Sequence, residues 1–155
     1  MSISCSAAFA KNDITLWPKQ KPAIEKNAAL EADITGLINK MSLEQKVGQM
    51  VQAEITWVTP QDVKKYHLGS VLNGGGTFLH NDRNASVSDW VSFMDELYLA
   101  SMDTSAGGVA IPVTYGIDAV HGNNKFIGAT LYPHNIGLGA AHNPALIYKI
   151  GEATA

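Results

Sequence analysis

The strongest constraint on the fold is a glycine-bounded loop that follows an apolar run. Residues 115–123 read Tyr-Gly-Ile-Asp-Ala-Val-His-Gly-Asn, so Asp118 lies between two glycines. The preceding residues, 109–115, are mostly β-branched or aromatic, which predicts a short buried strand. Asp118 and His121 then lie at the carboxyl edge of this strand, where folds with parallel sheets collect their functional side chains.

Helix signals precede this strand. Apolar residues recur at three- and four-residue steps over 24–40, which predicts a helix that buries one face. Ser42 and Gln45 form a capping-box pattern at the start of a second helix. The residues of this second helix that we expect to face inward are Leu43, Val47, Met50 and Val51.

Strands and helices then alternate. Thr59 and Pro60 predict a short helix to about Tyr66, residues 69–72 predict a strand, and residues 73–76 form the loop at its carboxyl end. We expect Ser88 to cap the next helix, and residues 143–152 are again helical in pattern. The alternation predicts an α/β fold with a parallel sheet. The helix after Ser88 has an apolar stripe made by Trp90, Val91, Phe93, Met94, Leu97 and Tyr98.

Composition excludes several classes of partner. The chain is 46% hydrophobic and 16% charged, which is typical of a globular core. The net charge is −3 and no basic run is long enough to follow a phosphate backbone, so we expect no nucleic-acid partner. No stretch approaches the roughly 18 to 20 apolar residues of a membrane span.

Four sequence blocks occur in a specific order. They are residues 41–50 (MSLEQKVGQM), 68–76 (LGSVLNGGG), 116–122 (GIDAVHG) and 132–140 (YPHNIGLGA). In this order and spacing they resemble the N-terminal part of glycoside hydrolase family 3, in its β-glucosidase and β-glucan exohydrolase branch. The resemblance covers roughly residues 25 to 155.

The resemblance implies that residues 24–155 are the N-terminal portion of a (β/α)8 TIM-like barrel. A complete barrel takes about 250 residues. The helical pattern that begins at Asn143 still continues near the end of the 155 residues. We therefore expect the barrel domain to be truncated in this chain.

The resemblance also implies a function for the full-length enzyme. This function is retaining exo-β-glucosidase or exo-1,3/1,4-β-glucanase activity, which removes terminal non-reducing glucose from β-linked glucans and oligosaccharides without a cofactor. Such hydrolysis needs two carboxyl groups. The family's nucleophile lies on a later strand and its acid/base in a following domain, so no catalytic residue is assigned here. The alternative is a catalytically inactive fragment or a carbohydrate-binding piece.

Asp118 is the first predicted substrate contact. The resemblance implies that it binds two hydroxyls of the terminal glucose, and a carboxylate has two acceptor oxygens suited to that task. The alternative from the residues alone is an aspartate that caps a turn. Asp118 and His121 could together suggest a metal site, but they are only two ligands and zinc needs three or four. We expect no metal, and a His121 that is hydrogen-bonded to loop backbone.

Gly75 and Gly76 are predicted to line the glucose pocket with backbone. The alternatives are a tight turn or a phosphate cradle, although the Lys-Ser/Thr pair of a phosphate loop is absent. Glu54 is interpreted either as part of the pocket floor or as a member of a buried ion pair with a lysine or arginine. Trp57 is interpreted either as a sugar-stacking ring or as a core residue. Residues 131–139 are expected to form a buried strand entry and turn without chemistry.

The amino terminus resembles a processed secretory segment. Residues 1–10 are mostly small and end in Ala8-Phe9-Ala10, which fits a signal-peptidase site before Lys11. We interpret them as a signal-peptide remnant, which implies a periplasmic or extracellular location; the alternative is an ordinary terminus. Residues 11–23 predict an extended arm. The single cysteine, Cys5, cannot form an internal disulfide.

Overall fold

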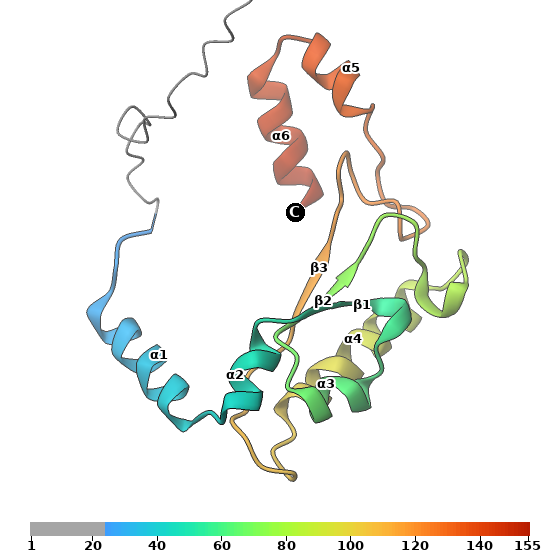
Figure 1. Ribbon diagram of the computed structural model, residues 1–155. Coiled ribbons are helices and arrows are strands. Elements are labelled where there is room, and N and C mark those ends of the chain that lie inside the picture. The colour runs from blue at the N-terminus through green and yellow to red at the C-terminus, as the bar shows by residue number, and fades with distance from the viewer. Residues whose placement is uncertain (1–23) are drawn as a thin grey trace, which may run out of the picture.

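The computed structural model describes residues 24–155, so the predicted signal remnant and arm lie outside the described residues. Within 24–155, parallel strands form a single sheet in the order β1-β2-β3 (Figure 1). The strands are β1 (Gln52–Glu54), β2 (Ser70–Asn73) and β3 (Thr114–Ile117). This agrees with the predicted α/β class with a parallel sheet.

Helix α3 (Pro60–Tyr66) connects β1 to β2, and α4 (Val87–Met102) connects β2 to β3. The two helices lie side by side on one face of the sheet (Figure 1). The main core lies between them and the sheet, and Val71 of β2 and Trp90 of α4 are fully buried in it. The remaining buried apolar residues are Ile55, Val58, Val63, Leu68, Leu79, Ala85, Phe93 and Leu97.

Strand β3 is shorter than the sequence pattern predicts, whereas β2 has the predicted length but is shifted by one residue. Strand β3 begins at Thr114, whose amide donates to the Gly69 carbonyl at 3.0 Å, and not at Val109 as predicted. Pro112 explains the late start, because proline has no N–H to donate to a strand ladder. Strand β1 was not predicted, since three residues are too few to show a period-two pattern.

Two of the helix starts test the capping predictions. Helix α3 begins as predicted, with Thr59 at the N-cap, Pro60 at the first position and Asp62 completing a capping box. Helix α4 is capped by Ser86 and not by the predicted Ser88. The Ser86 hydroxyl accepts from the Asp89 amide at 3.2 Å, while the Asp89 carboxylate accepts from the Ser86 amide at 2.8 Å.

We expect Ser86→Ala to lower the free energy of unfolding by about 1 kcal/mol, because the first turn of α4 loses a hydrogen-bonded cap. Urea unfolding followed by circular dichroism measures this change. Ser88→Ala is the matched control, since Ser88 is exposed in the same turn without capping it and is expected to be nearly neutral. Equal effects of the two substitutions would contradict the assignment of the cap.

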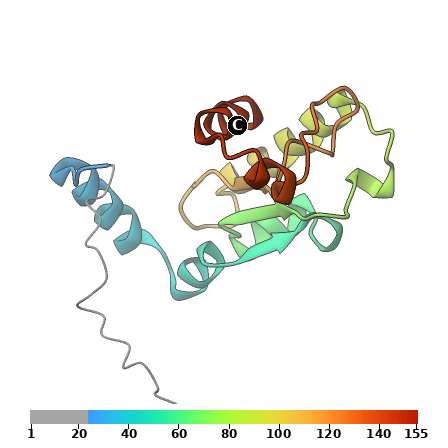
Figure 2. The ribbon, with the colours of Figure 1, turned by 90° about the horizontal axis from the view of Figure 1, so that it is seen from above.

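The first two helices expose the apolar faces that the sequence predicts to be inward. Helix α1 (Ala28–Lys40) has no buried residue and lies apart from the sheet (Figures 1 and 2). In α2 (Leu43–Gln49) the buried residues are Gln45 and Gly48. The prediction that four apolar residues of the second helix face inward is wrong for the described chain; their exposed fractions are 72% for Leu43, 55% for Val47, 87% for Met50 and 41% for Val51.

Close backbone packing explains the orientation of α2. A β-carbon at Gly48 would lie 1.9 Å from the backbone oxygen of Tyr66, so only glycine allows the two helices to meet there. This contact leaves the apolar side chains of α2 along an open groove of about 810 Å³. The apolar residues that line the groove are Leu43, Val47, Val51, Ala53, Trp57, Val58, Tyr66 and Leu68.

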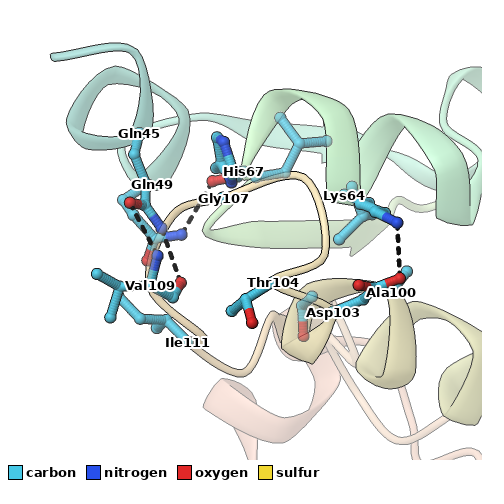
Figure 3. Close-up of a pocket in the computed structure, with 13 residues that line it drawn as sticks. Gln45, Gln49, Lys64, His67, Ala100, Asp103, Thr104, Gly107, Val109 and Ile111 are labelled. Carbon is cyan, nitrogen blue, oxygen red and sulfur yellow. Dashed lines mark hydrogen bonds and ion pairs between the residues drawn. The ribbon is translucent and has the colours of Figure 1, made fainter. Parts of the chain in front are cut away.

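Side-chain amides close the amino-terminal end of the sheet (Figure 3). The Gln45 amide donates to the Val109 carbonyl at 2.7 Å and accepts from the Val109 amide at 3.1 Å. Lys64 donates to Asp103 at 2.6 Å in the same region. The Gln45 side chain thus binds a segment 64 residues away. Of the predicted capping box, only the hydrogen bond from the Gln45 amide to the Ser42 hydroxyl is formed. The cavity there has a volume of about 10 Å³, room for about one water molecule.

Two helices follow β3. Helix α5 (Asn135–Ala140) replaces the predicted strand entry at residues 131–139, where Leu131 forms an isolated bridge with Gly122. Helix α6 (Pro144–Thr154) begins at the Asn143 cap, as its sequence pattern predicts. Both helices lie beyond the carboxyl ends of the strands (Figure 1). They border a cavity of about 400 Å³ that is also lined by residues 117 and 119–122.

Candidate functional site

The candidate site lies where the three strands end. Glu54 ends β1 and Asn73 ends β2, while Asp118 directly follows β3. In the sheet register Glu54 is aligned with Leu72, which is aligned with Gly116, so these three residues share one face. Val71 points to the opposite, helix-covered face. The face that carries Glu54 is therefore the one without α3 and α4.

The loop after β2 meets the loop after β3. A β-carbon placed at Gly75 would lie 3.8 Å from Asp118 Oδ2, and one at Gly74 would lie 4.0 Å from Glu54 Cγ. The structure thus brings Asp118 and Gly75 together, as expected of residues that share a site. Gly76 has nothing within 4 Å of the equivalent position, so it lies farther from the carboxylate.

Asp118 is held by a constrained backbone. Ala119 has a φ of 35°, a left-handed conformation that costs energy for a residue with a β-carbon. The Asp118 side chain is exposed and accepts no hydrogen bond from residues 24–155. The turn-capping alternative therefore finds no support in the described chain. An exposed carboxylate with free acceptor oxygens can bind an external donor.

Two loop segments cross next to Asp118 and fix the position of His121. His121 Nδ1 lies 2.8 Å from the Tyr132 carbonyl, and the Tyr132 amide donates to the His121 carbonyl at 2.8 Å. Gly122 has a φ of 102°, and a β-carbon there would lie 2.3 Å from the Thr130 carbonyl oxygen. The prediction that His121 is hydrogen-bonded to loop backbone is confirmed.

Lys125 is the residue of the site that sequence reasoning missed. It is only 2% exposed, and its ammonium donates to the carbonyls of Gly74 at 2.5 Å, Gly75 at 2.9 Å and Thr77 at 2.8 Å. Burial lowers the pKa of Lys125, while the charges of Asp118 and Glu54 oppose this effect. A lysine in a polar loop normally indicates a solvated surface, so the sequence offered no signal for this role.

Glu54 lies under the same loop. Burial favours its neutral form, but hydrogen bonds to Thr56 and the charge of Lys125 hold the pKa of Glu54 below its ordinary value. The Thr56 amide donates to Glu54 Oε2 at 2.8 Å, and the Thr56 hydroxyl donates to the same oxygen. Glu54 is therefore ionised at neutral pH and is not poised to donate a proton.

Trp57 does not belong to the core. Its side chain is 87% exposed and lines the apolar groove between α2 and α3. The core interpretation of Trp57 is wrong for the described chain. Its groove is lined by neither Asp118 nor residues 74–77, the segment called the glycine loop from here on.

The glycine loop is built around a cation and not around an anion. Three of its carbonyl oxygens point at the Lys125 ammonium, whereas a phosphate cradle needs backbone N–H groups aimed at the ligand. The Thr77 amide instead donates to the Gly74 carbonyl at 3.3 Å. Among residues 24–155, no group of three or more His, Cys, Asp or Glu side chains is arranged to hold a metal ion.

Comparison with known sequences identifies the family. The sequence model described as the glycosyl hydrolase family 3 N terminal domain matches residues 42–155. The chain belongs to glycosyl hydrolase family 3. The resemblance that the four sequence blocks carry is therefore confirmed, and three of those blocks contain the β2 loop, Asp118 and the Tyr132 segment that form the candidate site.

Two known enzymes resemble this chain, one in sequence and one in structure. The lysosomal beta glucosidase of Dictyostelium discoideum is 32% identical over 130 residues, which cover 75% of this chain and 16% of that protein. The exo-1,3/1,4-beta-glucanase from a Pseudoalteromonas species is 48% identical, with a TM-score of 0.78. That match covers 84% of this chain and 16% of the glucanase chain; for a mutant of the same glucanase the shares are 84% and 21%.

The chain thus spans about a fifth or less of the length of these relatives. The matched part contains the parallel sheet and its helices. No helix within residues 24–155 has both the length and the apolar character to cross a bilayer.

Proposed function

We propose that this chain is the N-terminal portion of the (β/α)8 barrel of a retaining exo-β-glucosidase or exo-1,3/1,4-β-glucanase. In this proposal the complete enzyme removes terminal non-reducing glucose from β-linked glucans and oligosaccharides, and needs no cofactor. Asp118 binds hydroxyls of that glucose. The observation that carries the proposal is the exposed Asp118 carboxylate, which lies at the carboxyl edge of a parallel sheet beside the glycine loop.

The sheet geometry supports a barrel. Residues 52–117 form a β-α-β-α-β unit, in which α3 and α4 cover only one face. In a closed barrel, helices surround the sheet and the uncovered face turns toward the barrel interior. Strands β1 and β3 are both edge strands, so each can pair with a further strand of the complete enzyme.

The site supports substrate binding and not proton transfer. Retaining hydrolysis needs a nucleophilic carboxylate and a protonated acid at about 5 Å from each other. The pKa of Glu54 is lowered, so this residue is unsuited to the acid role. We assign Asp118 to substrate binding, Gly75 to the backbone wall of the glucose pocket and Gly76 to its outer rim. The nucleophile and the acid/base belong to the remainder of the enzyme.

The second candidate is a catalytically inactive fragment or a carbohydrate-binding piece. The open apolar groove and the exposed face of α1 favour it for the 155-residue chain taken alone, because such surfaces are normally covered in a stable domain. We also propose a periplasmic or extracellular location, for which the small-residue tract ending at Ala10 is the support.

Release of glucose from laminari- and cello-oligosaccharides tests the proposal. We expect the complete enzyme to release glucose as the β-anomer, which proton NMR observes before mutarotation. The 155-residue chain is expected to release none. A complete enzyme that is inactive on all β-linked glucose oligosaccharides, or that releases the α-anomer, would contradict the proposed reaction.

A further inference from the structure

Lys125 lies at the centre of the loop contacts that surround the candidate site. Its side chain crosses from the loop after β3 to the loop after β2, over 48 to 51 residues of sequence. An ammonium group has three donors, and here each of three loop carbonyls accepts from it. The donor capacity of the buried ammonium is therefore fully used by the glycine loop.

The contacts of this ammonium define the shape of the glycine loop. The carbonyls of Gly74, Gly75 and Thr77 converge on one point, which fixes three peptide planes within residues 74–78. The Phe78 ring lies 5.1 Å from the ammonium and adds a cation–π contact. These contacts hold the run of three glycines in one conformation, although glycine has no side chain that could restrict its backbone.

The backbone of Lys125 is anchored as well. Its amide donates to the Asn123 side chain at 2.9 Å. The next residue, Phe126, packs on the buried Trp90 of α4 with the ring centroids 5.3 Å apart. The lysine therefore extends from a segment that is fixed to the core.

The position of Gly75 connects the loop held by Lys125 with Asp118, the proposed substrate contact. A β-carbon at Gly75 would lie 3.8 Å from Asp118 Oδ2, so the conformation of the loop sets the space beside the carboxylate. The negative charges of Asp118 and Glu54 both act on the Lys125 ammonium. One buried cation thus lies near two carboxylates and orders the loop beside them.

We propose that Lys125 is a positioning residue for glucose binding. It fixes the Gly74–Thr77 carbonyls against Asp118 and so gives the carboxylate and the loop backbone the geometry that a terminal sugar ring requires. This inference rests on the proposed function of Asp118, but the loop-ordering part of it is measurable without any substrate. Lys125 acts through the loop and through Asp118, and makes no contact with the reacting atoms.

The first test measures loop order directly. In the complete enzyme, we expect Lys125→Met to accelerate hydrogen–deuterium exchange in a peptide that covers residues 73–78, by about tenfold or more, while exchange in α3 stays unchanged. Lys64→Met is the matched control, since it also removes a hydrogen-bonded ammonium, the one on Asp103 at the other end of the sheet. Unchanged exchange at residues 73–78 in Lys125→Met would overturn the proposal, whatever the enzyme hydrolyses.

The second test separates positioning from stability. We expect Lys125→Met to lower kcat/KM for a cello-oligosaccharide by about 10- to 100-fold, well below the melting temperature of the variant. In a double-mutant cycle with Asp118→Asn, the effect of Lys125→Met should shrink severalfold, because the residue that it positions is already impaired. Additive effects would mean that Lys125 only stabilises the fold, and would overturn the positioning role.

Lys125→Arg keeps the test decisive if the methionine variant does not fold. It retains the charge, but a planar guanidinium cannot place three donors on the carbonyls that a compact ammonium reaches. We expect faster exchange at residues 73–78 and a smaller loss of kcat/KM than for methionine. Wild-type enzyme without glucose release would contradict the proposed function, whereas active wild-type enzyme with wild-type behaviour in Lys125→Arg would contradict the positioning role alone.

Discussion

Asp118→Asn in the complete enzyme is expected to lower kcat/KM for β-linked glucose oligosaccharides by about 100-fold or more. The carboxylate is exposed and free of hydrogen bonds from the described chain, so its oxygens are available to sugar hydroxyls. Each charge-assisted hydrogen bond contributes about 1.5 to 3 kcal/mol, and about 1.4 kcal/mol corresponds to a factor of ten. Asparagine keeps the shape but loses the charge and one acceptor. Steady-state kinetics on cellobiose and laminaribiose measure the loss.

The control for this substitution is Asp95→Asn, which changes an exposed aspartate in the middle of α4. We expect both variants to keep the wild-type melting temperature within a few degrees, because neither carboxylate supports the core. The value of kcat should fall along with kcat/KM where the hydroxyl contacts tighten in the transition state. Wild-type kcat/KM in Asp118→Asn would contradict the substrate-binding role.

Trp90→Ala is expected to lower the free energy of unfolding by about 3 to 5 kcal/mol, the range for truncation of a large buried aromatic side chain. Trp90 is fully buried between α4 and the sheet, and its ring centroid lies 5.3 Å from that of Phe126. Its loss leaves a cavity in the core and releases the segment that carries Lys125. Chemical denaturation followed by circular dichroism measures the change in stability.

Val91→Ala is the matched control, because Val91 is the next residue of α4 and is 51% exposed. We expect it to change stability by less than about 1 kcal/mol. Trp90→Ala should also increase hydrogen exchange at residues 123–130, whereas Val91→Ala should not. If Trp90→Ala lowered the free energy of unfolding no more than Val91→Ala does, the described packing of α4 against the Phe126 segment would be contradicted.

The sequence predicts those parts of the fold that depend on local chemistry. Thr59 with Pro60, and Asn143 with Pro144, specify helix starts through their own side chains and backbone angles, and both starts are observed. Asp118 lies at the carboxyl end of a strand as predicted, because a β-branched run followed by a glycine-bounded loop is a strong local pattern.

The features that sequence patterns miss depend on distant partners. Lys125 contacts carbonyls about 50 residues away, and nothing near it in sequence distinguishes it from a surface lysine. The local pattern makes Gln45 part of a helix cap, but its side chain binds Val109. The orientation of α2 follows from the Gly48 contact with Tyr66, which no periodicity reveals. Periodic patterns predict which face of a helix is apolar, but not whether that face is covered.

The strand order β1-β2-β3 has a consequence for synthesis on the ribosome. Each strand pairs with the one that precedes it in sequence, so each new pairing closes a loop no longer than one strand-helix unit. Addition of strands in this order can proceed as the chain emerges, amino terminus first. Until later segments arrive, the growing edge and the apolar groove beside α2 remain uncovered. If the sheet closes into the proposed barrel, we expect the nascent protein to depend most on chaperones after these residues have folded and before that closure.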